Sequence, residues 1–382
     1  MNFDLTEEQQ MLNDSLRRFV SNDYGFDKRG EIIKSGKGTD PATWAALAEM
    51  GLLGFTFPED YDGLGGNAVD TMVVMENFGR GLVVEPYLAT VVLAGGLIRD
   101  LGNDARKSDA LPAIATGERL MAFAHSEPGA RYNLEHVNTT ARQDGDHFLI
   151  SGHKTAVLHG GQAGQLIVSA RTSGTAGDQQ GLSLFIVDAD SKGVKVNDYA
   201  AHDGHRIADI SLSSVTVSAG NLLGEIDQAF PAIEKAIDLG IAAICAEAVG
   251  AMEAMNAATL EYIKSRKQFG VPIGKFQVLQ HRMADMFIQT EQARTMAILA
   301  ANSADSDDRP SRREAISMAK TLVGQGARYV AQQGVQLHGG MGVTEEMFAA
   351  HLFKRLTLIN LLFGDADHHL GEVSDRLLAK SA

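Results

Sequence analysis

A chain of 382 residues can bury a large core, and its length fits two or three domains. The formal net charge of −14 argues against nucleic acid or an anionic membrane surface as the main partner. The single cysteine, Cys245, excludes an internal disulfide and a multi-cysteine metal site, and its apolar helical neighbours predict a buried thiol. Met1–Asp4 show no signal-peptide pattern and no apolar run reaches membrane-spanning length, so we expect a cytoplasmic protein.

The first part of the chain, residues 1–119, is predicted to form a helical domain. Thr6 and Gln9 have the spacing of a capping box at a helix start. Apolar residues then recur at helical spacing. They are Met11, Leu12, Leu16, Phe19 and Val20, followed by Trp44, Leu47, Met50 and Leu53. Pro58–Gly66 is predicted to be a loop, and helical periodicity returns over residues 70–80 and 88–101.

The middle part, residues 120–225, predicts a small antiparallel β domain or barrel. Short alternating runs indicate strands, at residues 147–150, 165–170, 182–187, 194–196 and 210–217. Turn pairs such as Asp144-Gly145 and Asp203-Gly204 separate these runs. Residues 172–180 are polar and contain glycine, so we expect an exposed loop there.

The last part, residues 226–382, predicts a helical domain. One apolar stripe consists of Ile233, Ile237, Ile241, Ile244, Ala248, Met252 and Met255, and a later one of Ile316, Ala319, Val323, Ala327 and Val330. Small neighbouring residues permit close helix contacts, which favours a four-helix bundle. Asn302–Arg313 is polar and charged and is expected to be a surface loop. The order α, β, α indicates an α+β protein.

The segment Tyr262–Arg282 lies between two predicted helices and gathers several ligand-binding side chains. Arg266 can bind a phosphate bidentately, Gln268 can bond a ribose or a ring edge, and Phe269 can cover a flat base. Gly270 is placed to cap the first helix, and Pro272 two residues later prevents the helix from continuing. The alternative is a polar helix hairpin with an ordinary cap.

A second segment, Gln336–Gly342, follows another predicted helix, and its glycines would let a backbone approach a ligand closely. Together the segments contain R-x-x-F-G at residues 266–270, a Gln at 277, and Q-x-x-G-G at residues 336–340. These motifs, at this separation, resemble those of the acyl-CoA dehydrogenase family, and the resemblance covers the whole chain. It implies that the chain binds FAD held by a neighbouring subunit. The implied residues are Arg266, Gln268, Phe269, Phe276, Gln277, Gln336, Gly339 and Gly340.

The catalytic carboxylate that the resemblance implies is missing. In the family a Glu removes the α-proton of an acyl-CoA while the β-hydrogen leaves as hydride to the flavin, and a dry site should raise the pKa of that Glu. The family places this Glu in E-G-T near the C-terminus, where this chain has Phe363. Some members place it on a bundle helix, where this chain has Gly240 followed by Ile241.

The β domain lacks the residues that contact the chain's own flavin ring. Ser126–Ala130 resembles the family's T-E-P-x-A, but Arg131-Tyr132-Asn133 replaces G-S-D. Ala156-Val157-Leu158 replaces the W-I-T whose Trp packs on the ring and whose Thr hydroxyl lies near flavin N5. What a chain gives to its own flavin is therefore lost, whereas what it gives to a neighbour's flavin is retained.

The main hypothesis is the non-catalytic half of a heteromeric acyl-CoA dehydrogenase, with an expected α2β2 assembly. A Glu-bearing partner would hold the flavin ring, and the resemblance implies electron-transfer flavoprotein as acceptor. One alternative is a homomeric (homotetrameric) flavoprotein with a displaced base, Asp365 or Glu247. Asp365 could instead cap a helix, with His368 and His369 solvated. Another alternative is a scaffold or CoA-binding protein without flavin, and related desulfinase chemistry on this fold stays open. No metal site is expected.

Overall fold

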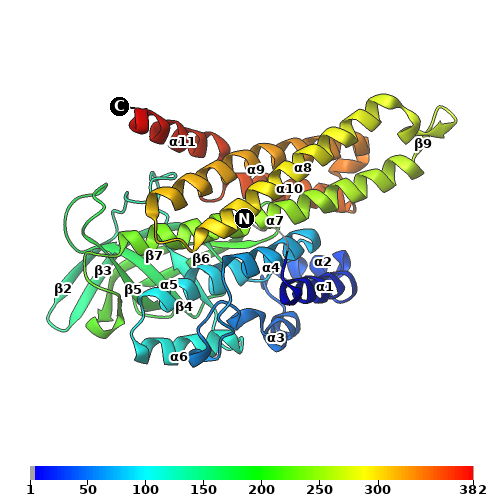
Figure 1. Cartoon of the computed structure of the whole chain (residues 1–382). Helices are drawn as coiled ribbons and strands as arrows, with labels where there is room; N and C mark the ends of the chain where they lie inside the picture. The colour runs from blue at the N-terminus through cyan, green and yellow to red at the C-terminus, as the bar shows by residue number, and fades with distance from the viewer. Residues whose placement is uncertain (1–4, 382) are drawn as a thin grey trace. The chain divides into compact units, whose positions relative to one another are not determined.

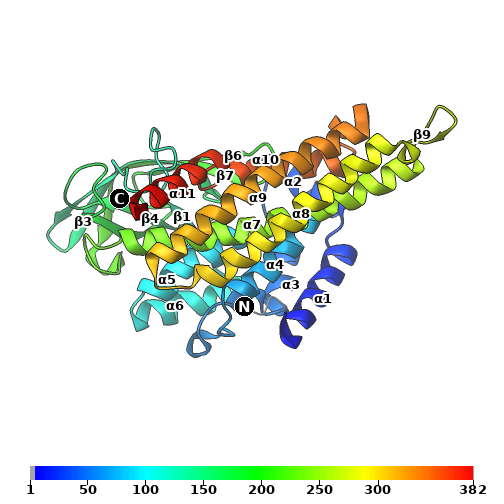
Figure 2. The ribbon, with the colours of Figure 1, turned by 45° about the horizontal axis from the view of Figure 1, so that its top comes forward.

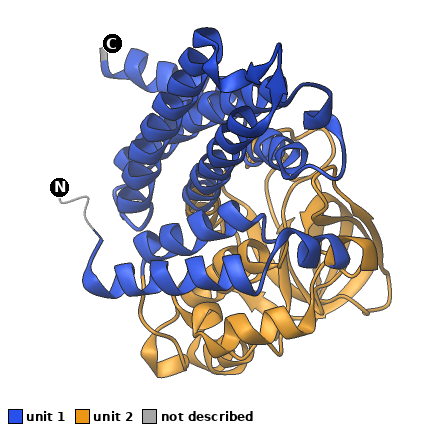
Figure 3. Cartoon of the chain, turned by 90° about the vertical axis from the view of Figure 1, so that its right-hand side faces the viewer, with its two compact units in different colours: residues 1–31, 67–83, 241–382 blue, residues 32–66, 84–240 orange. Residues whose placement is uncertain are grey.

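The computed structural model describes residues 5–381, so the expectation drawn from Met1–Asp4 concerns residues outside the described part. The chain divides into two compact units (Figure 3). Residues 1–31, 67–83 and 241–382 form the first, which we call the helical unit, and residues 32–66 and 84–240 form the second, the sheet unit. Along the chain, helices precede and follow the strands (Figure 1), which confirms the α+β class. The three-domain boundaries after residues 119 and 225 stay a prediction.

The sheet unit is built on one eight-stranded sheet. Its strands are β1 (Met121–Ala124), β2 (Thr140–Asp144), β3 (His147–Leu158), β4 (Gln165–Arg171), β5 (Leu182–Asp188), β6 (Val194–Ala200), β7 (Arg206–Ser218) and β8 (Leu222–Leu223). The order is β6-β7-β3-β2-β4-β5-β8, with β1 beside β4. All five predicted strands are confirmed. Alternate residues such as Phe148, Ile150, Val168 and Phe185 point into a common apolar core.

The prediction of a purely antiparallel sheet is wrong at one place, because β4 pairs in parallel with both β1 and β2. The 40 residues between β1 and β4 leave room for the crossover that parallel pairing needs. β1 was missed because all four of its residues are buried, so its sequence shows no alternation. β2 was missed because four of its five residues are exposed and mostly polar.

Short helices complete the sheet unit and open the helical unit. In the sheet unit they are α3 (Pro41–Glu49), α5 (Gly96–Leu101) and α6 (Asp104–Ala115), with η1 (Leu52–Gly54), η2 (Glu59–Tyr61), η3 (Leu88–Gly95) and η4 (Ala219–Asn221). In the helical unit they are α1 (Glu7–Asn22) and α4 (Ala68–Gly81), while α2 (Phe26–Ser35) crosses the boundary between the units. The predicted capping box is confirmed: the Gln9 amide donates to Thr6 Oγ1 at 3.2 Å, and the Thr6 amide to Gln9 Oε1 at 3.1 Å.

Five long helices follow the sheet. They are α7 (Phe230–Ser265), α8 (Gln277–Ala304), α9 (Arg309–His338), α10 (Phe348–Leu361) and α11 (Ala366–Ser381) (Figures 1 and 2). Both predicted apolar stripes are buried, and Cys245 on α7 is buried as well. Burial raises the pKa of the Cys245 thiol to about 12, so the thiol is unreactive at neutral pH. Within residues 5–381, no helix has the length and apolar character needed to cross a bilayer.

The predicted surface loop over Asn302–Arg313 is wrong. Helix α8 runs on to Ala304 and α9 begins at Arg309, which leaves a break of four residues. Asp308 caps α9 by accepting from the Ser311 amide, and Pro310 occupies the first turn, where its missing amide proton costs nothing. Arg312 and Arg313 are buried, so their charge in the sequence concealed a helix.

Helices α4 and α7 approach each other across two glycines. A Cβ at Gly250 would overlap the Glu76 carbonyl oxygen, and a Cβ at Gly79 would overlap the Glu247 carbonyl oxygen. We expect Gly250→Ala to lower the free energy of unfolding by about 1–3 kcal/mol, because the helices must separate to admit the methyl group. Urea denaturation measures this loss. Gly371→Ala on α11, where a Cβ meets open space, is the control and should be neutral or stabilising.

Candidate functional site

The segment predicted to bind a nucleotide lies at the tip of the α7–α8 hairpin (Figures 1 and 2). A short ribbon joins the helices, with β9 (Lys267–Gln268) pairing antiparallel to β10 (Val271–Pro272), followed by η5 (Ile273–Lys275). Phe269 and Gly270 form the turn with φ of 53° and 79°, as a two-residue hairpin turn with the twist of its strands requires. The predicted C-cap role of Gly270 is therefore wrong, since α7 ends at Ser265 and Gly270 serves the ribbon.

Side chains at this hairpin tip, residues 262–284, are exposed and cationic. All eight residues implied to bind FAD are exposed, and Phe269 is 91% exposed. The Phe269 and Phe276 rings meet edge to face with centroids 6.2 Å apart. The tip contains five Lys and Arg residues and no Asp or Glu, in a chain whose net charge is −14. This is the charge distribution expected where an anionic ligand or surface binds.

The end of α9 lies beside the hairpin tip. His338 stacks on Tyr262 of α7 with ring centroids 4.5 Å apart, which brings Gln336, Gly339 and Gly340 to the level where α7 ends. Gly339 has φ of 61° and begins η6 (Gly339–Val343). Among the described residues nothing lies within 4 Å of a Cβ built on Gly339 or Gly340, so a ligand could approach that backbone. The structure thus brings both predicted segments together.

His338 was missed by sequence reasoning, although it lies within the Q-x-x-G-G segment. Its Nδ1 lies 2.8 Å from the Gly334 carbonyl oxygen, which can only accept, so Nδ1 carries the proton. Burial lowers the pKa of His338 and keeps the ring neutral. Nε2 is then a bare acceptor, and no described residue donates to it. An unpartnered acceptor beside exposed glycines fits a ligand that offers a hydroxyl or amine.

These features fit a nucleotide such as the adenosine diphosphate part of FAD. Arg266 offers a fork for a phosphate, Gln277 offers an amide at the start of α8, and Phe269 offers a flat face for a base. A tip without carboxylates does not repel the pyrophosphate. On these observations the residues present can hold the nucleotide half of the cofactor.

The turn at the first position expected for the catalytic Glu is firmly held. Phe363 has φ of 57° and Gly364 has φ of 111°. Lys320 Nζ donates to the carbonyl oxygens of Ile359, Asn360 and Gly364 at 2.7–2.9 Å, which satisfies the end of α10. Burial lowers the pKa of Lys320 to about 8. The turn geometry is present, but its side chain is a phenyl ring.

The alternative carboxylates each have a structural partner. Asp365 caps α11 by accepting from the His368 amide at 2.9 Å, which confirms the helix-cap interpretation. The accompanying expectation of a solvated His pair is wrong for His369, which is buried and bonds the Phe363 carbonyl oxygen through Nε2 at 3.0 Å. Burial lowers the pKa of His369 to about 3. Glu247 binds Arg355 through both carboxylate oxygens, at 2.5 and 2.6 Å, within the bundle.

In the sheet unit, the T-E-P-like segment supports a buried ion pair. Lys154 Nζ donates to Glu127 Oε1 at 2.7 Å and to Ser169 Oγ at 3.0 Å. Glu127 also accepts from the amides of Asn138 at 2.6 Å and Thr139 at 3.0 Å. Burial opposes the charge on Glu127, but Lys154 and these donors outweigh it and lower the pKa of Glu127. Lys154 was missed by sequence reasoning.

The position of the missing ring-packing Trp is an exposed alanine. Ala156 has φ of 52° at a bulge in β3, between the paired residues Lys154 and Val157. Its amide and the Thr155 hydroxyl both donate to Asp209 Oδ1, at 3.1 and 2.8 Å. Ala156 and Leu158 offer neither an aromatic face nor a hydroxyl, so these residues do not fit the ring contacts that the family makes there.

Family models and known proteins cover nearly the whole chain. The N-terminal, middle and C-terminal domain models of acyl-CoA dehydrogenase match residues 6–118, 122–215 and 228–378. The probable acyl-CoA dehydrogenase YngJ of Bacillus subtilis is 32% identical over 377 residues, 96% of this chain and 97% of that protein. The subunit CarC of the caffeyl-CoA reductase-Etf complex of Acetobacterium woodii is 29% identical over 380 residues, 98% of this chain and 99% of that protein.

Solved structures agree with these matches. The steroid ACAD Tcur3481-Tcur3483 superposes with a TM-score of 0.88 at 27% identity, and covers 98% of this chain and 99% of that one. Members of the matched family are oxidoreductases of acyl-CoA that use FAD. With all three domain models matched in order, the chain belongs to the acyl-CoA dehydrogenase family.

Proposed function

We propose that this chain is the subunit of a heteromeric FAD-dependent acyl-CoA dehydrogenase that lacks the catalytic Glu and completes the FAD site of its partner. One observation carries this proposal. The hairpin tip and the end of α9 together form an exposed cationic site for a nucleotide, while both expected carboxylate positions hold Phe363 and Gly240. A homomer would need both halves in one chain.

The partner subunit would supply the chemistry. The carboxylate of the partner would remove the α-proton of the acyl-CoA, and FAD, when bound, accepts the β-hydride, so that a C=C bond forms. This chain would hold the nucleotide end through Arg266, Gln268, Phe269, Phe276, Gln277, Gln336, Gly339 and Gly340. Electron-transfer flavoprotein would reoxidise the flavin. CarC, a similar protein, is by name a subunit of a complex with Etf.

Heteromers occur among proteins that this chain resembles. The name of the similar steroid ACAD joins two components, Tcur3481 and Tcur3483. The C-terminal sequence F-G-D-A-D-H-H-L resembles that of the small subunit of pimeloyl-CoA dehydrogenase. Dicarboxyl-CoA, fatty acyl-CoA and steroid-derived CoA esters are therefore the substrate classes to assay.

The decisive experiment measures FAD per chain from the visible spectrum. We expect the chain expressed alone to carry little flavin, and co-expression with a Glu-bearing subunit to restore about one FAD per pair together with acyl-CoA oxidation. Near-stoichiometric FAD and dehydrogenase activity in the chain alone would overturn the proposal. The homomeric alternative would then return, with Asp365→Asn and Glu247→Gln as its tests.

Arg266→Ala should weaken FAD binding to the complex by about 10- to 100-fold, because a charge-assisted bond to phosphate contributes roughly 1.5–3 kcal/mol. Equilibrium dialysis of FAD measures this loss. Lys267→Ala is the matched control: it removes the neighbouring exposed cation, which the family motif does not use. Equal FAD affinity in Arg266→Ala and wild type would favour the scaffold alternative.

A further inference from the structure

A groove opens on the side of the hairpin tip that the proposed nucleotide site does not use. It has a volume of about 470 Å³ and is lined by Leu260, Ile263, Lys264, Pro272, Gly274, Lys275, Gln280 and Met283. Four apolar side chains make its floor, and two lysines with Gln280 stand at its edge. All eight belong to the helical unit.

The groove faces away from α9. Leu260 and Tyr262 are two residues apart on α7, so their side chains point about 160° apart around the helix axis. Tyr262 stacks on His338 of α9, which puts Leu260 on the opposite side. On α8, Arg282 donates to Gln333 of α9 at 2.7 Å, and Gln280, two residues earlier, lines the groove. The groove is thus distinct from the nucleotide site at the end of α9.

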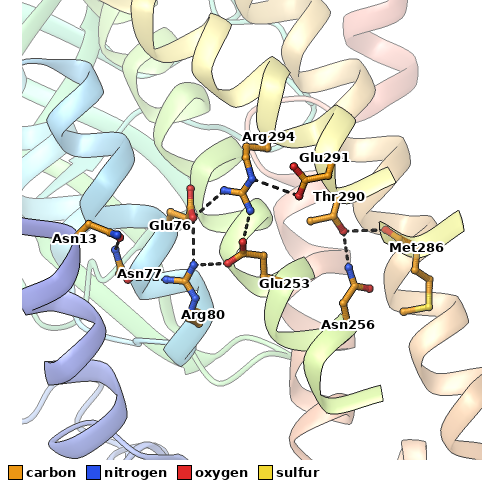
Figure 4. Close-up of polar contacts among 10 residues, drawn as sticks. All are labelled: Asn13, Glu76, Asn77, Arg80, Glu253, Asn256, Met286, Thr290, Glu291 and Arg294. Carbon is orange, nitrogen blue, oxygen red and sulfur yellow. Dashed lines mark hydrogen bonds and ion pairs between the residues drawn. The ribbon is translucent and has the colours of Figure 1, made fainter. Parts of the chain in front are cut away.

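Nearer the base of the hairpin, the same helical face is covered by α4. Figure 4 shows Glu76 and Arg80 of α4 joined to Glu253 of α7 and Arg294 of α8. Arg294 Nη1 lies 2.9 Å from Glu76 Oε1, Arg80 Nη2 lies 3.2 Å from the same oxygen, and Glu253 binds both arginines. The family resemblance gives none of these four residues a role.

Beyond this network the face runs on towards the tip without a cover. Leu260 lies seven residues after Glu253 on α7, and Phe287 lies seven before Arg294 on α8, so each pair shares nearly one face. Leu260 is 40% exposed and Phe287 is 60% exposed. Large apolar side chains left open along a packed helical face mark a place where another element docks.

The charges at the groove select an acidic occupant. Lys264 and Lys275 stand at its edge, and the hairpin tip contains no carboxylate. Helix α1 has a matching exposed face: Glu7, Met11 and Asp14 recur at helical spacing, with Glu8 alongside. Met11 is 70% exposed. A helix with one central apolar side chain among carboxylates is complementary to an apolar floor between lysines.

Within the helical unit, α1 and the groove are linked through α4. Helix α1 packs on α4, and α4 packs on α8 beside the groove network. A patch that carries both halves of a complementary pair can match itself across a two-fold axis, with each half contacting the other half of the second copy. We propose that the groove at the hairpin tip binds α1 of a second copy of this chain in an isologous dimer.

Sedimentation of the purified chain tests this proposal, with the chain itself as the probe. The wild type should be a dimer or a larger assembly at about 10 μM. Lys264→Glu combined with Lys275→Glu should raise the dimer Kd at least about tenfold, because several exposed ion pairs become repulsive. Lys192→Glu with Lys195→Glu, two exposed lysines in the sheet unit, gives the same change in net charge and should leave the Kd unchanged.

A charge swap identifies the occupant. Glu7→Lys with Glu8→Lys should also dissociate the dimer. An equimolar mixture of this variant with Lys264→Glu/Lys275→Glu should dimerise again, because both contacts of the mixed dimer then pair opposite charges. A monomeric wild type, or a groove variant with the wild-type Kd, would overturn the proposal, and failure of the mixture would remove α1 as the occupant. None of these readouts depends on FAD, so they stand apart from the proposed function.

Discussion

Replacing Lys154 by Met is expected to lower the free energy of unfolding by about 3–5 kcal/mol, because the change leaves the Glu127 carboxylate buried without its counter-charge. Both residues are almost completely inaccessible to solvent, and Lys154 Nζ lies 2.7 Å from Glu127 Oε1. The amides of Asn138 and Thr139 would still bond the carboxylate but would not neutralise it. Urea denaturation at pH 7 measures the loss.

Two variants give this measurement its meaning. Lys195→Met on β6 removes an exposed lysine from the same sheet and should stay within about 0.5 kcal/mol of wild type. The double variant Glu127→Gln/Lys154→Met removes both charges and should be less destabilised than Lys154→Met alone. Equal unfolding midpoints for Lys154→Met and Lys195→Met would contradict a stabilising role for the pair.

The pH dependence follows from the direction of the Glu127 shift. The pKa of Glu127 is lower in the folded state, so its stabilisation is fully present above the unfolded pKa of about 4.5. That contribution is lost as the pH falls through the lower folded value. The stability difference between wild type and Lys154→Met should therefore be largest near neutral pH and should narrow below about pH 4.5.

Arg355→Met should cost a similar amount, about 3–5 kcal/mol, by leaving Glu247 charged inside the bundle. The guanidinium of Arg355 binds both oxygens of Glu247, and both side chains are almost fully buried. Arg355→Lys should also destabilise, because an ammonium lacks the planar fork that meets two oxygens. Thermal unfolding followed by circular dichroism gives the ranking.

The adjacent residue supplies the control. Lys354 pairs with Glu345, whose side chain is 71% exposed, so Lys354→Met should change stability by less than about 1 kcal/mol. Glu247→Leu/Arg355→Met should recover much of the loss, since it replaces a buried ion pair by apolar contacts. If Arg355→Met is as stable as Lys354→Met, the ion pair does not hold α7 to α10.

The sequence by itself determined the features that depend on neighbouring residues. The capping box at Thr6, the strand at residues 182–187 and the stripe on α9 were all predicted, because periodicity and capping act over a few residues. The resemblance motifs at residues 266–270 and 336–340 were also readable, although only the structure joined them through Tyr262 and His338.

Only the tertiary structure decided which charges are buried and what they meet. Glu127 and Lys154 are 27 residues apart, Glu247 and Arg355 are 108 apart, and Lys320 reaches carbonyls 39–44 residues away. A local sequence pattern gives a charged residue to the surface, which is why the segment 302–313 was predicted as a loop although it buries Arg312 and Arg313. The cost of burying a charge is offset by a partner that packing brings from elsewhere in the chain, so this partner is decided by the fold.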